Sequence, residues 1–252
     1  MSKLNAALGC LVMAGTLAAT VSMGAAHADP MEFILPNGTI NGAAMMIRSI
    51  DAPTVYAQCY QRLQVPKCTK GSDKFTVVGC VEQIYDPNNP EVLVSETTYA
   101  NGKKDGYELT YYEGGSLYKV MPYRNHQADG MSYEFNRSGR LVETTQYFEG
   151  MRHGDARGYY ESGNVKFKAS YSLDLLHGLY QTYYDALDQV QSNVFYEKGK
   201  RSGPGMFYDE QGKQIYEVTF KDDKAISGKC TSGRKLTNEE LARILTQPPK
   251  CR

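Results

Sequence analysis

Residues 147–154 read Tyr-Phe-Glu-Gly-Met-Arg-His-Gly, and Tyr159-Tyr160 and Gly163 follow downstream. The spacing from the first tyrosine to the last glycine of this octapeptide recurs along the chain. A tyrosine stands seven positions before a glycine every 24 or 25 residues. We call these tyrosines the first column: Tyr99, Tyr123, Tyr147, Tyr171 and Tyr196, which precede Gly106, Gly130, Gly154, Gly178 and Gly203. A fixed period of this size predicts one small supersecondary unit stacked on copies of itself.

Each period contains a second aromatic residue five positions after its glycine. We call these residues the second column: Tyr111, Phe135, Tyr159, Tyr183 and Tyr208. Nine positions after the glycine, four units carry a further glycine and the fifth carries Leu187. A glycine there suits a hairpin that needs a positive φ. Short segments rich in Tyr, Thr, Val and Phe lie between the glycines, so each unit is predicted to be a β-hairpin and the array an elongated antiparallel meander.

The two columns are expected to form one shared apolar face, because a lone hairpin is only marginally stable in water. Successive strand residues point to opposite faces, so the residue after the second column should face outward. Three of these residues form a third column: Tyr112, Tyr160 and Tyr184. Tyrosine gives a large contact area at low entropy cost, so the third column is predicted to bind another protein. The alternative is that the N-terminal segment or a second copy of the chain covers it.

These motifs resemble the MORN-repeat variants of bacterial proteins. Residues 147–163 follow the pattern Tyr-x-x-Gly-x-x-x-Gly…Tyr-Tyr-x-x-Gly, and Tyr99 to Gly106 and Tyr196 to Gly203 repeat its first part. His126 and Asp174 replace the first glycine of the pattern, and we expect altered turns there. The resemblance covers residues 92–228. It implies an open twisted sheet used for contact with other molecules, and some bacterial members of the family are labelled antitoxins.

Residues 1–28 have the features of a secretory signal peptide. Lys3 precedes an apolar stretch that ends in Ala26-His27-Ala28. This pattern predicts a leader that is cleaved after Ala28, export, and a periplasmic location. An uncleaved membrane anchor is the alternative. No later segment approaches the apolar length of a membrane-spanning helix.

Five cysteines follow the predicted cleavage point, all outside the repeats: Cys59, Cys68, Cys80, Cys230 and Cys251. In an exported protein they predict a Cys230–Cys251 disulfide and one bridge among the other three. Residues 29–91 lack the period and are predicted to form a disulfide-bearing cap, with a separate binding module as the alternative. Residues 229–252 are predicted to form a capping helix, because Thr237 and Glu240 have the spacing of a capping box.

No chemical site stands out in the mature chain. His126, His153 and His177 lie in turns between units, and acidic residues such as Glu113 and Asp185 are read as solvated turn residues. The standard hydrolase, metalloprotease and nucleotide-binding motifs do not occur, so neither catalysis, a metal nor a cofactor is expected. Removing Lys3 leaves 27 basic against 28 acidic residues, a balance that does not favour binding to nucleic acid.

The sequence therefore predicts a non-enzymatic, exported protein-binding scaffold. A more specific form of this prediction is an antitoxin or immunity protein. The sequence does not determine the identity of the partner or whether the chain forms a homo-oligomer. Two alternatives are an envelope structural or membrane-associated protein, and a hydrolase that uses the N-terminal segment.

Overall fold

The computed structural model describes residues 66–76, 79–186 and 188–251. The predicted signal peptide, Cys59, Leu187 and much of the predicted N-terminal cap lie outside these ranges. Among the described residues, no helix has the length and apolarity to cross a membrane.

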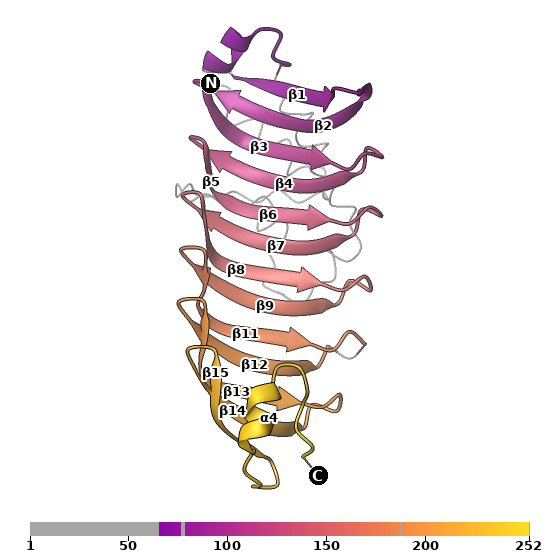
Figure 1. Cartoon of the computed structure of the whole chain (residues 1–252). Coiled ribbons are helices and arrows are strands. Elements are labelled where there is room, and N and C mark those ends of the chain that lie inside the picture. The colour runs from indigo at the N-terminus through magenta and orange to yellow at the C-terminus, as the bar shows by residue number, and fades with distance from the viewer. Residues whose placement is uncertain (1–65, 77–78, 187, 252) are drawn as a thin grey trace, which may run out of the picture. The chain divides into compact units, whose positions relative to one another are not determined.

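The described chain is an antiparallel sheet whose strands follow chain order (Figure 1), as predicted. The strands are β1 (Cys80–Asp86), β2 (Asn89–Ala100), β3 (Lys103–Tyr111), β4 (Leu117–Arg124), β5 (Gln127–Ala128), β6 (Gly130–Phe135), β7 (Leu141–Phe148), β8 (Met151–Tyr159), β9 (Val165–Ser172), β10 (Leu175–Leu176), β11 (Gly178–Tyr183), β12 (Val190–Glu197), β13 (Lys200–Tyr208), β14 (Gln214–Lys221) and β15 (Lys224–Cys230). A 3-10 helix, η3 (Gly71–Phe75), precedes them, and one α-helix, α4 (Asn238–Arg243), follows.

Contacts between Cα atoms divide the chain into two compact units. Among the described residues, the first unit ends at Met131 and also includes Phe135–Arg140, and the second comprises Ser132–Glu134 and the residues from Leu141 onward. Each unit is described below by itself.

The turns that join one hairpin to the next share a single backbone geometry. Two successive residues have positive φ in every one of these described turns, for example Asn101 at 51° and Gly102 at 75°. His126 at 72° and Asp174 at 66° adopt the same conformation as the glycines they replace. The expectation of altered turns at these two positions is therefore wrong, and a side-chain hydrogen bond described below explains how a non-glycine residue is tolerated.

The turns within each hairpin carry the predicted glycines. Gly115, Gly139, Gly163 and Gly212 have φ between 76° and 88°, as the sequence predicts. In the turn from Tyr160, the Gly163 N–H donates to the carbonyl oxygen of Tyr160 at 2.9 Å, and the Tyr160 N–H donates to the carbonyl oxygen of Asn164 at the same distance.

The two aromatic columns lie on opposite faces of the sheet, contrary to the expectation of one shared face. In the second unit, Tyr171 pairs with Gly154 and Phe167 pairs with Gly158, which places these four residues on one face. Tyr159 follows Gly158 directly and therefore points to the other face. We call these surfaces the first-column face and the second-column face. A bulge between Gly158 and Tyr159 is repeated in the other hairpins, so the assignment holds along each unit.

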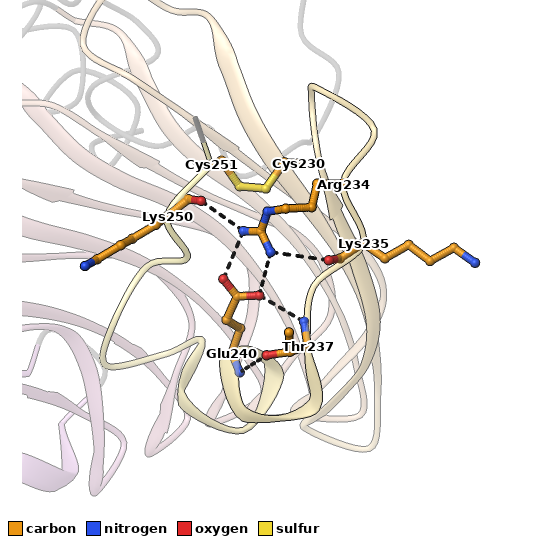
Figure 2. A network of polar contacts seen from close by, with 7 residues as sticks. All are labelled: Cys230, Arg234, Lys235, Thr237, Glu240, Lys250 and Cys251. Carbon is orange, nitrogen blue, oxygen red and sulfur yellow. Dashed lines mark hydrogen bonds and ion pairs between the residues drawn. A yellow bond between two sulfur atoms is a disulfide. The ribbon is translucent and has the colours of Figure 1, made fainter.

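The C-terminal segment folds as predicted, with a helix tied by a disulfide. The Cys230–Cys251 bond closes the segment, and Thr237 and Glu240 form the capping box of α4. The Arg234 guanidinium donates to both carboxylate oxygens of Glu240, at 2.9 and 3.0 Å, and also to the carbonyl oxygen of Lys250 (Figure 2). Arg234 consequently links the helix start, through Glu240, to the returning chain at Lys250.

The first unit contains the other described disulfide, between Cys68 and Cys80. This bond confirms the prediction of one bridge among Cys59, Cys68 and Cys80. It joins the segment before η3 to β1, where Cys80 is 1% exposed.

Candidate interaction face

One register position of the hairpin differs sharply between the two units. On the second-column face of the first unit, Leu109 pairs with Val120, and these side chains are 2% and 0% exposed. In the second unit the same position holds polar pairs or a mixed pair: Arg157 with Lys168, Gln181 with Asn193, and Met206 with Glu217. At this register position the second-column face is therefore apolar and buried in the first unit but largely polar in the second.

The neighbouring register position, on the first-column face, shows the reverse pattern. In the first unit Glu108 pairs with Met121, and the Glu108 carboxylate forms an ion pair with Lys104 at 2.6 Å. In the second unit this position holds small or apolar residues: Ala156 with Ala169, Tyr180 with Val194, and Gly205 with Val218. The second unit thus presents its apolar residues on the first-column face.

Three rings lie side by side on this face across β9, β11 and β12. Phe167 stacks on Tyr180 with centroids 5.6 Å apart, and Tyr180 lies 5.7 Å from Tyr196. All three side chains are partly buried. Burial raises the pKa of Tyr180 and of Tyr196, so both phenols are neutral at physiological pH. We call Phe167, Tyr180 and Tyr196 the aromatic cluster.

Glycine makes room for the cluster on the adjacent strand. A Cβ atom at Gly158 would lie 2.1 Å from a ring carbon of Phe167. The Phe167 ring therefore lies flat across the Gly158 backbone, and any larger residue at this position would displace it.

An arginine, Arg152, lies on the first-column face of the second unit, over the ring of Tyr171. The Arg152 guanidinium lies 4.4 Å from the centroid of the Tyr171 ring and donates to the Asp174 carboxylate at 3.2 Å. The Asp174 carboxylate also accepts the Arg152 backbone N–H at 2.9 Å, and this hydrogen bond holds the pKa of Asp174 below its usual value. Asp174 thus takes the place of glycine in its own turn, and its carboxylate binds the backbone of Arg152 next to the preceding turn between hairpins.

The same arrangement recurs elsewhere in each unit. The Arg201 backbone N–H donates to the Asp223 carboxylate at 3.0 Å, and the Lys104 backbone N–H donates to His126 Nδ1 at 3.1 Å. The replaced glycines are therefore sites where an acceptor side chain joins consecutive turns.

Helix α4 covers the C-terminal end of the first-column face. Leu241 of this helix and Ile244, which directly follows it, belong to one buried cluster with Val218 and Phe220, which are each 2% exposed. Burial in this cluster raises the pKa of Tyr216 to about 12. The second unit thus shows one part of the face closed by an amphipathic helix and another part, the aromatic cluster, only partly buried.

The third column has a structural role. The hydroxyls of Tyr112, Tyr160 and Tyr184 donate to the carbonyl oxygens of Phe135, Tyr183 and Tyr208, at 2.8–2.9 Å. Each acceptor is a second-column residue of the following hairpin, so these tyrosines join consecutive hairpins. All three are partly buried, and a binding role for them stays a prediction.

The remaining predicted residues are spread through both units. Among the second column, Phe135 is 0% and Tyr183 7% exposed, while Tyr111, Tyr159 and Tyr208 are partly buried. All five first-column tyrosines are partly buried. His126, His153 and His177 are exposed, and no set of three potential metal ligands occurs among the described residues.

Phe167 and Tyr180 were not predicted from the sequence as site residues. Neither belongs to a column, because Ser95 and Lys119 stand at the Phe167 position and Glu108 at the Tyr180 position. Alternation from Tyr171 to Phe167 along β9, and from Gly178 to Tyr180 along β11, was the available signal.

Comparison with known families identifies two of the hairpins. Residues 104–125 and 152–172 match the MORN repeat variant family. These two segments are similar to MORN-variant repeats. Each matched segment contains a cation–π pair between a basic side chain and a first-column ring. Lys104 Nζ lies 4.8 Å from the centroid of the Tyr123 ring, and Arg152 lies over Tyr171. No curated protein matches the chain.

Proposed function

We propose that this MORN-repeat protein is an exported, non-enzymatic binding module whose protein partner docks on the aromatic cluster of the second unit. The observation that carries the proposal is the partly buried state of Phe167, Tyr180 and Tyr196 on the face that α4 closes elsewhere. Clustered aromatic rings are the side chains most enriched at protein–protein hot spots. A neutral tyrosine offers such a ring together with one hydroxyl for a hydrogen bond.

The docking mode of α4 indicates what kind of partner surface suits this face. Leucine and isoleucine side chains of a short helix fill the space above Val218 and Phe220. A partner that presents an apolar helix face would bury the aromatic cluster in the same way.

The test is affinity capture from native cell extracts with the mature chain, followed by mass spectrometry. A Phe167→Ser/Tyr180→Ser variant should lose the captured partner while it keeps the fold, measured by circular dichroism. Tyr160→Phe/Tyr184→Phe removes two third-column hydroxyls and keeps both rings, so this variant should retain the partner. Equal capture by the wild type and the Ser variant would contradict the proposed docking face.

Export is supported by the two disulfides of the described residues, because such bonds persist in oxidising compartments. The proposed periplasmic location predicts a mature chain that begins at Asp29. N-terminal sequencing of protein from the periplasmic fraction checks this, and a retained Met1 would contradict cleavage.

A narrower form of the proposal is an immunity or antitoxin role, in which the docked protein is a toxin. It is motivated by the family resemblance together with the predicted signal peptide. A toxin gene beside this gene, and rescue of toxin-expressing cells by the wild type but not by the Ser variant, would support it. Rescue by neither protein would leave a binding module without this role.

A further inference from the structure

Strand β15 is the last strand of the sheet and its outer edge is only half covered. Residues 234–236 cover the end of this strand, because the Leu236 N–H donates to the Gly228 carbonyl at 2.9 Å and the Cys230 N–H donates to Arg234. No described strand pairs with the outer edge of residues 224–227. The C-terminal segment therefore leaves the first half of β15 open.

Ile226 lies at the centre of the open half. The register with β14 pairs Thr219 with Ser227 and Phe220 with Ala225, so Ile226 is the extra residue of a bulge. Gly228 and Cys230 use their backbone groups on the outer side, and alternation along the strand places those of Ile226 on the same side. Its side chain is 54% exposed.

A groove lined by both apolar and polar residues accompanies this edge. It has a volume of about 440 Å³ and lies between the start of β15 and helix α4. Ile226 and Leu245 form its rims, at 54% and 56% exposed, and the buried Leu241 and Ile244 lie at its base. One large aliphatic side chain would cover both rims.

The charge beside the groove is positive. Lys224 lines the groove and is paired in register with Lys221, and neither has an ion-pair partner among the described residues. The acids of the same turn are engaged elsewhere, Asp223 with Arg201 at 3.1 Å and Asp222 with Lys200 at 3.8 Å. An incoming segment with carboxylates would therefore find two unpaired cations.

We propose that the open half of β15 accepts an extended acidic segment of a partner protein as an added strand, with one aliphatic side chain of that segment in the groove. Main-chain hydrogen bonds to an exposed sheet edge provide affinity in such complexes, and side-chain pockets provide specificity. The lysines that protect this edge from uncharged strands select for an acidic one. The site does not depend on the aromatic cluster, and its proposal stands separately from the proposed function.

The probe is a seven-residue peptide of alternating Glu and Val with blocked ends, titrated into the isotope-labelled mature protein and followed by NMR. We expect the Ile226 amide resonance to shift with saturation and a Kd of about 0.1–1 mM, the range for a few hydrogen bonds and one buried side chain. The same peptide with Lys in place of Glu should bind at least about tenfold more weakly. No shift of the Ile226 amide with the acidic peptide would overturn the proposal.

Two variants separate the groove from a general effect of charge. Ile226→Glu should weaken binding of the acidic peptide by about tenfold or more, since it removes a rim and adds a like charge. The matched control is Phe148→Glu, because Phe148 is 52% exposed and lies on β7, and this change should leave the affinity unaltered. Equal weakening by both variants would overturn the proposal. A concentration-dependent dimer that Ile226→Glu abolishes would also overturn it, because the occupant would then be a second copy.

Discussion

The first unit buries the second-column face of its hairpins, whereas the second unit buries, below α4, the first-column face. In the first unit Leu109, Val120 and Phe135 are at most 2% exposed. In the second unit Val218 and Phe220 are each 2% exposed, and Lys168 stands at the register position of Val120. Both units nevertheless repeat the same hairpin, the same turns and the same bulge.

This difference teaches that the repeat specifies backbone geometry and leaves the choice of the core face to other positions. The repeated spacing supplies turn glycines and column rings, which place aromatic residues on both faces. The residues between them decide which face is apolar: Leu109 and Val120 in the first unit, and Ala169 and Val194 in the second. A binding face can thus change along one array without any change of fold.

The largest effect is expected from exchanging the residues of one register position between the units. Val120→Lys places an unpaired charge in a fully buried site, and we expect it to lower the free energy of unfolding by about 3–5 kcal/mol. Lys168→Val makes the reverse change on a polar face, where the ammonium lies 5.0 Å from the Tyr183 centroid, and should cost no more than about 1 kcal/mol. Urea denaturation of both variants gives the two values. Similar losses would show that the two units bury the same face.

A smaller difference is expected on the first-column face. Phe220→Ala removes a ring from the cluster under α4 and should cost about 3–5 kcal/mol, including the cavity it leaves. Tyr123 occupies the same register position in the first unit, since it pairs with Gly106 as Phe220 pairs with Gly203. It is only partly buried, so Tyr123→Ala should cost about 1–2 kcal/mol. Thermal and urea unfolding measure both changes, and a greater loss at Tyr123 would reverse the assignment of the core faces.

The sequence was sufficient to predict the hairpins, their order and the turn glycines. These features depend on local spacing, such as a glycine nine positions after another, and each copy of the repeat reinforces the next. The Cys230–Cys251 bond and the Thr237–Glu240 cap were predictable for the same reason, because both depend on residues close in sequence.

The assignment of faces could not be predicted from the columns alone. Gly154 pairs with Tyr171, and Tyr159 lies five residues after Gly154 on β8, so ordinary alternation places the second column opposite the first once this register is known. The interpretation of His126 and Asp174 failed for another reason. Their acceptor atoms bind a backbone N–H that lies 22 residues earlier, a contact that is visible only once the hairpins are stacked.

The turns give a third and weaker test, because the first unit uses His126 where the second uses Asp174. Asp174→Ala removes the acceptor for the Arg152 backbone N–H and retains a Cβ at positive φ, so we expect Tm to fall by about 3 °C or more. Asp174→Gly loses the same hydrogen bond but relieves the backbone, and its Tm should lie between those of Asp174→Ala and the wild type. Calorimetry measures this order. A Gly variant less stable than the Ala variant would show that the backbone conformation at this turn costs nothing.

The smallest effect concerns pH and applies to the end of the second unit. The hydrogen bonds from Arg234 lower the pKa of Glu240 from 4.5 to about 2. Because this pKa is lower in the folded chain than in the unfolded one, Glu240 stabilises α4 fully above pH 4.5, and the stabilisation is lost as the pH falls from 4.5 to about 2. The exchange rate of the Leu241 amide, corrected for the intrinsic rate, should therefore rise as the pH falls from 4.5 to about 2. Glu240→Gln should remove that pH dependence. Glu239→Gln is the control and should retain it, because the Glu239 side chain is 85% exposed and its carboxylate lies 3.6 Å from the Arg243 guanidinium. A wild-type profile that is flat over this range would mean that the disulfide and the apolar contacts of Leu241 and Ile244 hold the helix without the Arg234–Glu240 pair.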